Sequence, residues 1–153
     1  MRFLRFALAF PIGLMVMFAV VSSVEFLGQQ VAPPSPEMKA AIELHLKQDP
    51  GAAEAMRAAL PTMPVLAFVS VLLAWIAGAV GGTYAACRVA GAMQLPLGIA
   101  MGVMVALAAL VNLLILPHPS WMWPAGLALP IAAGVLMGRW MAEPLAYARS
   151  QRG

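Results

Sequence analysis

The sequence predicts an all-α membrane protein, a bundle of four transmembrane helices with a short helical loop between the first two. The composition is 63% hydrophobic and only 10% charged, whereas a soluble domain carries roughly a quarter charged residues. The charged residues are also widely spaced, because His118 is the sole ionisable side chain between Arg88 and Arg139. A membrane-spanning helix needs about 20 mostly apolar residues, so this interval is long enough for two spans.

Four apolar runs succeed one another along the chain. We predict four spans, at about 6–26, 63–87, 96–116 and 121–141. Pro117 and Pro119 separate the last two, because proline ends a helix and moves the residue before it out of the helical region. The basic start of the chain would also suit a signal peptide. The first apolar run is longer than a signal sequence needs and no clean A-x-A site closes it, so we expect it to be kept as a span.

Basic residues are distributed unevenly between the two sides of the predicted bundle. One side carries six of them: Arg2, Arg5, Arg88, Arg139, Arg149 and Arg152. The other side carries three: Lys39, Lys47 and Arg57. The positive-inside rule then predicts that both termini lie in the cytoplasm. The expected partner is the lipid bilayer, and no basic run with interleaved aromatic residues points to nucleic acid.

Residues 28–62 are the longest predicted stretch outside the spans, and we expect them to form an extracytoplasmic amphipathic helical cap. Ser35 and Pro36 are a helix N-cap and first residue, and the helix they begin covers about 37–48. Asp49 and Pro50 repeat the signal before a second helix, at about 51–60. Both helices are too short to be stable alone in water. They are therefore expected to lie on the outer membrane face or to cap the bundle.

Glycines at four-residue spacing occur in three of the predicted spans. The pairs are Gly78 with Gly82, Gly98 with Gly102, and Gly134 with Gly138. Membrane helices approach one another closely through such small residues, so these glycines are predicted to be helix-packing positions. The spacing leaves open whether they pack within one chain or between copies.

A few polar or aromatic residues at membrane depth form the candidate site. Glu25 ends the first span, Asn112 lies near the end of the third, and His118 lies in the turn that follows. By topology all three are expected near the outer face, where they would either serve as caps and interhelical hydrogen bonds or bind a ligand or proton. Trp75, in the middle of the second span, would either fill the bundle core or stack on a ligand.

The other tryptophans fit interfacial anchors, which concentrate at membrane–water boundaries. Trp121 and Trp123 belong to the outer belt and Trp140 to the inner one. The chain has one cysteine, Cys87, which cannot form an internal disulfide. The two histidines are far apart in sequence and no Cys/His spacing typical of zinc is present. We therefore expect no catalytic, cofactor-binding or metal site.

Two motifs carry a resemblance to a known group of proteins. These are Trp75-x-x-Gly78-x-x-Gly81-Gly82 and Asn112-x-x-x-x-Pro117-His118-Pro119-x-Trp121. Together with most of the remaining chain, they resemble an uncharacterised family of small bacterial four-helix inner-membrane proteins. That resemblance implies the same four-helix topology, a location in the bacterial inner membrane and no particular activity.

The chain also departs from the family pattern between the first two spans. Gln29 stands where members often have a histidine, and Ala32 where they often have an aromatic residue. The 36–39 region lacks the pair of aspartates that members often carry there. The resemblance therefore places no metal or polar role on these positions.

Three functions follow as hypotheses. The first is a non-catalytic multi-pass membrane protein that acts by packing with itself or with a membrane partner. The second is a small proton- or cation-coupled transporter or channel that uses Glu25. The third is a membrane enzyme with Glu25 and His118 as an acid/base pair, which the absence of a nucleophile or cofactor motif disfavours.

Overall fold

The computed structural model describes residues 2–116 and 118–150, with side chains for Arg5 and for residues 7–116 and 118–143. All regular structure in this part of the chain is helical, which confirms the all-α prediction. The elements are α1 (Arg2–Val31), α2 (Pro36–Leu46), α3 (Ala52–Ala59), the 3-10 turn η1 (Leu60–Thr62), α4 (Val65–Ala90), α5 (Gln94–Ile115) and α6 (Met122–Ser150). Four of them, α1, α4, α5 and α6, are long and apolar enough to cross a membrane.

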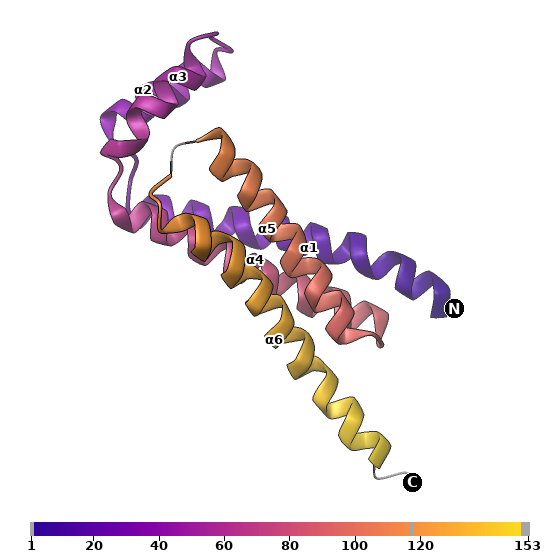
Figure 1. Cartoon of the computed structure of the whole chain (residues 1–153). Coiled ribbons are helices and arrows are strands. Elements are labelled where there is room, and N and C mark those ends of the chain that lie inside the picture. Colours follow the sequence, from indigo (N-terminus) through magenta and orange to yellow (C-terminus); the bar gives the residue numbers. More distant parts are fainter. Residues whose placement is uncertain (1, 117, 151–153) are drawn as a thin grey trace.

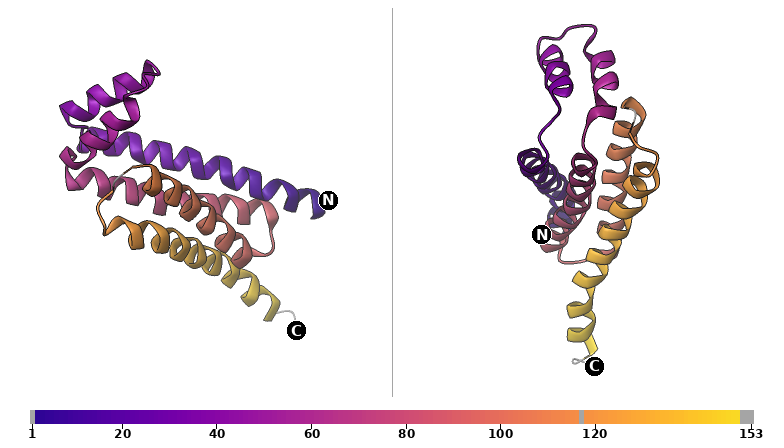
Figure 2. Two further views of the ribbon diagram at one scale, coloured as in Figure 1. Left: turned by 45° about the horizontal axis from the view of Figure 1, so that its top comes forward. Right: turned by 90° about the vertical axis from the view of Figure 1, so that its left-hand side faces the viewer.

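The four long helices run alternately up and down (Figures 1 and 2). Helix α1 packs on α4 and α5 packs on α6, while α4 also contacts both α5 and α6. Helices α2 and α3 stand beyond one end of the bundle, which we call the cap end (Figure 1). The α4–α5 turn lies at the opposite end, together with the start of α1 and the end of α6. We call this the terminal end.

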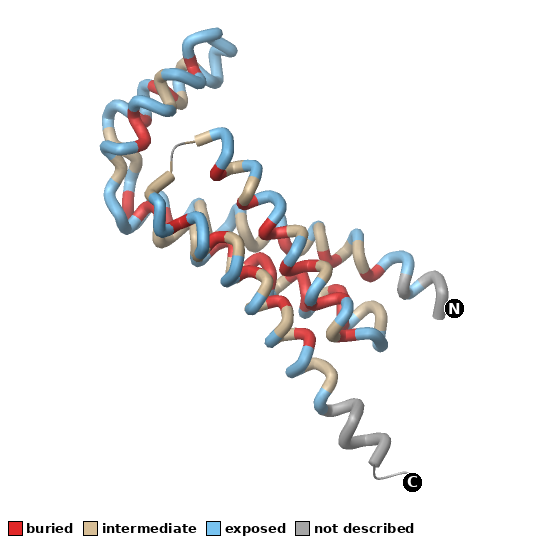
Figure 3. The backbone as a smooth tube through the Cα atoms, in the orientation of Figure 1, coloured by how far each residue is buried: buried red, intermediate tan, exposed pale blue. Residues whose placement is uncertain are grey.

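Buried residues concentrate where the long helices face one another, and the outer sides are exposed (Figure 3). The outward side chains are largely apolar, as Phe18, Leu107 and Leu136 illustrate with exposed fractions of 59%, 51% and 64%. A surface of this kind suits lipid, which solvates apolar side chains as well as the protein interior does. Trp121 and Trp123 lie just before and at the start of α6, near the cap end, and Trp140 lies toward the terminal end.

The predicted packing glycines contact neighbouring helices of the same chain. A Cβ atom on Gly78 would meet the side chain of Val21, and one on Gly82 would lie 2.9 Å from the carbonyl oxygen of Gly13. Both of these neighbours belong to α1. In the second helix pair, Gly98 and Gly102 on α5 face Gly134, Gly138 and the backbone around Ile131 on α6. The glycine faces are therefore used within one chain.

Helix α1 extends beyond the predicted end of its span, and its apolar stretch covers Ala7–Val31. No proline follows Glu25 until Pro33, and Gly28 fits closely against Ser70 of α4, 2.7 Å from where its Cβ would be. Glu25 consequently lies more than a helical turn inside α1 and not at its end.

Helix α2 begins as the sequence predicts, whereas α3 does not. Ser35 is the N-cap of α2 and its side chain accepts a hydrogen bond from the Met38 amide. The predicted capping role of Asp49 is wrong, because the N-cap of α3 is Gly51 and has no side-chain cap. Asp49 Oδ1 instead accepts from the Gly51 amide at 2.7 Å. This is the turn that Asp side chains form with the backbone two residues on.

Two segments connect the cap to the bundle, and hydroxyl groups join them. The Thr62 hydroxyl donates to the carbonyl of Ala59 at 2.7 Å, and Ser35 Oγ lies 2.7 Å from Thr62 Oγ1. Because the Thr62 proton is already used, the Ser35 hydroxyl is the donor between them. The start of α2 is thereby tied to the end of η1.

Candidate functional site

A cavity of about 380 Å³ lies at the cap end, between the bundle and the cap. Its walls come from α1, α2, α3, η1, α4 and α5 and from the turn after α5. The polar side chains that line it are Glu25, Gln29, Ser70, Asn112 and His118. Three sequence-predicted site residues, Glu25, Asn112 and His118, thus line one cavity although they are up to 93 positions apart along the chain.

Glu25 is half-buried on α1, and Gln29 follows it one helical turn later. Residues four apart lie on the same face of a helix, so both reach the same cavity. Glu25 forms no ion pair or side-chain hydrogen bond with the part of the chain that is described. It is also the one Asp, Glu, Lys or Arg among the described residues lining the cavity. A ligand here would therefore meet a single carboxyl group.

His118 is oriented by the end of α5. Its Nδ1 lies 2.9 Å from the carbonyl oxygen of Leu116. A carbonyl oxygen can only accept, so Nδ1 carries a proton and Nε2 of the neutral ring is an acceptor. Phe68 of α4 meets the imidazole edge-on, with ring centroids 6.0 Å apart and planes at 70°. The ring is held from two sides.

Asn112 contributes a second acceptor. Its Oδ1 is buried and has no hydrogen-bond partner among the described residues. A buried polar group without a partner costs roughly 1–3 kcal/mol. Such an atom beside a cavity is a natural contact for a hydrogen-bond donor that occupies the cavity.

The cap covers the cavity with apolar side chains. Met38 and Ile42 come from α2, Met56 from α3, and Leu60 and Met63 from η1 and the residues after it. Methionine side chains are flexible and adapt to ligands of different shape. On the bundle side, Arg57 Nε of α3 donates a long hydrogen bond of 3.4 Å to the carbonyl of Ile115. The cap is thus held over the end of α5.

Trp75 does not line this cavity. It is buried in the core below, where its ring lies 2.7 Å from where a Cβ on Gly126 would be. Its neighbours in that core include Phe68, Leu113 and Met122. The indole fills the space between α4 and α6 that a glycine leaves open.

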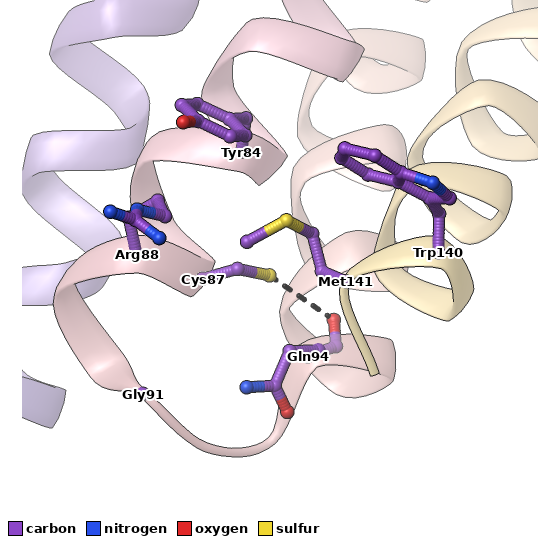
Figure 4. A pocket seen from close by; sticks show the side chains of 7 residues that line it. All are labelled: Tyr84, Cys87, Arg88, Gly91, Gln94, Trp140 and Met141. Carbon is purple, nitrogen blue, oxygen red and sulfur yellow. Dashed lines mark hydrogen bonds between the residues drawn. The ribbon is translucent and has the colours of Figure 1, made fainter. Parts of the chain in front are cut away.

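A second pocket, of about 370 Å³, lies at the terminal end. Figure 4 shows its lining side chains, which come from the end of α4, the following turn, the start of α5 and helix α6. Cys87 is buried there and its Sγ donates to the carbonyl oxygen of Gln94 at 3.6 Å. Within the described residues, no group of three or more His, Cys, Asp or Glu residues is placed to hold a metal ion.

Sequence reasoning missed several residues of the cap-end cavity. Gln29 could have been found from its spacing to Glu25, but a span that ended at residue 26 concealed it. Phe68 and the methionines Met38, Met56 and Met63 had no such signal. They reach the cavity only because the cap folds over the end of the bundle.

The sequence and structure were compared with known proteins. No family model, no curated protein and no solved structure matches the chain.

Proposed function

We propose that the chain is a non-catalytic, multi-pass protein of the bacterial inner membrane that binds a small organic cation, a protonated amine, in the cap-end cavity. In this proposal both termini are cytoplasmic, the cap is extracytoplasmic and Glu25 is the counter-charge of the ligand. The excess of basic residues predicted at the terminal end supports the orientation. The resemblance to small four-helix inner-membrane proteins supports the location.

The observation that carries the proposal is the character of the polar atoms around the cavity. Glu25 offers a carboxylate, Asn112 a buried unpartnered oxygen, and His118 an acceptor nitrogen. All three accept hydrogen bonds, and an ammonium group has three donors and no acceptor. Phe68 adds an aromatic ring, which attracts cations. The methionine-rich cover suits the hydrocarbon part of an amine.

The packing hypothesis from the sequence has less support, because its glycines contact helices of the same chain. Association with a second copy or a membrane partner would need the outer faces of the bundle, and it stays a prediction. The transporter hypothesis uses the same carboxylate. Transport also requires a path to the terminal end, and the buried core around Trp75 gives that hypothesis less support.

Binding of phenethylammonium to the full-length protein in detergent tests the proposal. The neutral, similarly sized phenethyl alcohol is the control ligand. We expect Glu25→Gln to weaken binding of the amine by about tenfold or more, since hydrogen bonds to charged groups contribute roughly 1.5–3 kcal/mol. Glu37→Gln removes an exposed carboxylate of α2 outside the cavity and should leave binding unchanged. Equal binding of amine and alcohol, or equal affinity of wild type and Glu25→Gln, would refute the proposal.

Flux in proteoliposomes separates a binding protein from a transporter. A binding protein takes up no labelled phenethylammonium against a proton gradient, whereas a transporter does so in wild type and not in Glu25→Gln. Uptake of that kind would replace simple binding by the transport hypothesis.

A further inference from the structure

The pocket at the terminal end is lined by one arginine without an ion-pair partner among the described residues, two aromatic side chains and a largely buried glutamine. It is lined by Tyr84, Cys87, Arg88, Gly91, Gln94, Trp140 and Met141. Figure 4 shows Tyr84 and Arg88 on one side, Trp140 on the other, and Gln94 below. The pocket lies where α4 ends at Ala90 and α6 approaches the end of its apolar stretch at Glu143. This is the depth of a membrane–water boundary if the four long helices span the bilayer.

The charge of the pocket is positive. Arg88 is exposed and forms no ion pair with any described residue. No Asp or Glu belongs to the described lining, so nothing neutralises the guanidinium locally. An arginine offers five donors in a planar fork that fits a phosphate group.

The start of α5 adds further donors. Its N-cap, Met93, provides no side-chain hydrogen bond to the first turn, so the helix begins with uncapped amide groups. Such an amino terminus carries partial positive charge and favours anions. Gln94 is only 8% exposed, lines the pocket, and makes no side-chain hydrogen bond with residues 7–116 or 118–143. The amide of this largely buried side chain has no partner among these residues and is free to donate to a polar ligand in the pocket.

The aromatic side chains point to the type of ligand. Tyr84 on α4 and Trp140 on α6 are 45% and 59% exposed. Tyrosine and tryptophan on the outer surface of membrane helices lie at the level of lipid headgroups. Above them the outward surfaces of α4 and α6 are apolar, as exposed Val80 and Leu136 show, and could accommodate acyl chains.

We propose that this pocket binds the phosphate group of an anionic phospholipid. Arg88 contacts the phosphate, and the Gln94 amide and the start of α5 donate to it. Tyr84 and Trp140 flank the glycerol region. A zwitterionic headgroup fits less well, because its ammonium group finds no carboxylate in the pocket. Basic pockets between membrane helices are known sites for anionic headgroups.

Native mass spectrometry and thermal unfolding of the full-length protein in detergent test this proposal. Phosphatidylglycerol is compared with phosphatidylcholine of the same chains, and with inorganic phosphate. We expect phosphatidylglycerol alone to bind and to raise the unfolding temperature. Arg88→Gln should weaken its binding by about fivefold, the effect of roughly one basic residue at a lipid surface. Arg88→Lys should retain part of it, because the charge remains but the planar fork is lost.

Arg139→Gln is the matched control, because it removes an exposed arginine at the same end that does not line the pocket. We expect it to leave phosphatidylglycerol binding unchanged. An equal loss in Arg88→Gln and Arg139→Gln would overturn the proposal and indicate general attraction to anionic surface. Equal protection by phosphatidylcholine would overturn the preference for anionic lipid. Equal protection by inorganic phosphate would overturn the lipid assignment.

Discussion

Gly98 of α5 and Gly134 of α6 approach so closely that a Cβ atom on either would meet the carbonyl oxygen of the other. The contact is between two backbones, which cannot move aside as a flexible side chain can. Glycine is required at both positions because any larger residue forces the helices apart. This pair and its neighbours Gly102 and Gly138 hold α5 and α6 together.

Gly98→Ala should therefore lower the free energy of unfolding by about 1–3 kcal/mol, the usual effect of adding atoms to a well-packed interface. Unfolding in mixed detergent, followed by circular dichroism, measures it. Ala108→Leu adds more volume on an exposed position of the same helix, and should change stability by about 0.5 kcal/mol or less. A similar loss in both variants would show that close approach does not limit this interface.

The contact between Gly78 and Val21 predicts a compensating pair of substitutions. A Cβ on Gly78 meets the end of the Val21 side chain, so Gly78→Ala should be destabilising and Val21→Ala should make room for it. We expect the double variant to be more stable than the sum of the single effects by about 1 kcal/mol. The same unfolding assay measures this coupling. Additive effects would contradict the contact, and a dependence on protein concentration would indicate packing between copies instead.

Replacement of Asn112 should raise the stability of the protein and weaken ligand binding. Because its Oδ1 is buried without a partner, Asn112→Leu should raise the free energy of unfolding by about 1 kcal/mol. The same change should weaken phenethylammonium binding, which titration of the purified protein measures. Wild-type affinity in this variant would remove Asn112 from the proposed site.

Thr83 provides the control for that experiment. Its Oγ1 is also buried without a partner among the described residues, but it does not line the cap-end cavity. Thr83→Val keeps the shape and should stabilise the protein in the same way without affecting binding. A loss of binding in Thr83→Val would mean that stability and affinity are coupled through the whole bundle.

Ser35→Ala should loosen the cap. It removes the side-chain cap of α2 and the hydrogen bond to Thr62, and loss of an N-cap costs about 1 kcal/mol. Hydrogen exchange should become faster in the first turn of α2, around Met38. Ser23→Ala removes a hydroxyl that bonds only within its own helix, to Ala19, and should leave exchange in α2 unchanged. Equal exchange in Ser35→Ala and wild type would show that the cap is held by other contacts.

Much of the secondary structure could be predicted because its signals are local. Long runs without charge identified the four apolar helices, and Ser35 with Pro36 identified the start of α2. The two wrong predictions concern helix ends, namely the start of α3 and the end of α1. Asp49 has the residue type of an N-cap, but its carboxylate is used in a turn with Gly51. The end of α1 lies beyond its predicted span because the polar residues after Glu25 do not stop a helix that packs on α4.

The sequence by itself determined that this chain is helical, that four of its helices are apolar enough for a membrane, and that Glu25, Asn112 and His118 fall toward one end. Only the tertiary structure decided that these three residues share a cavity, that Trp75 lies outside that cavity, and that the glycine pairs pack within one chain. Hydrophobicity and capping depend on neighbours along the chain. A cavity depends on which helices meet and on how the cap folds over their ends, and that is set by contacts between residues far apart in sequence.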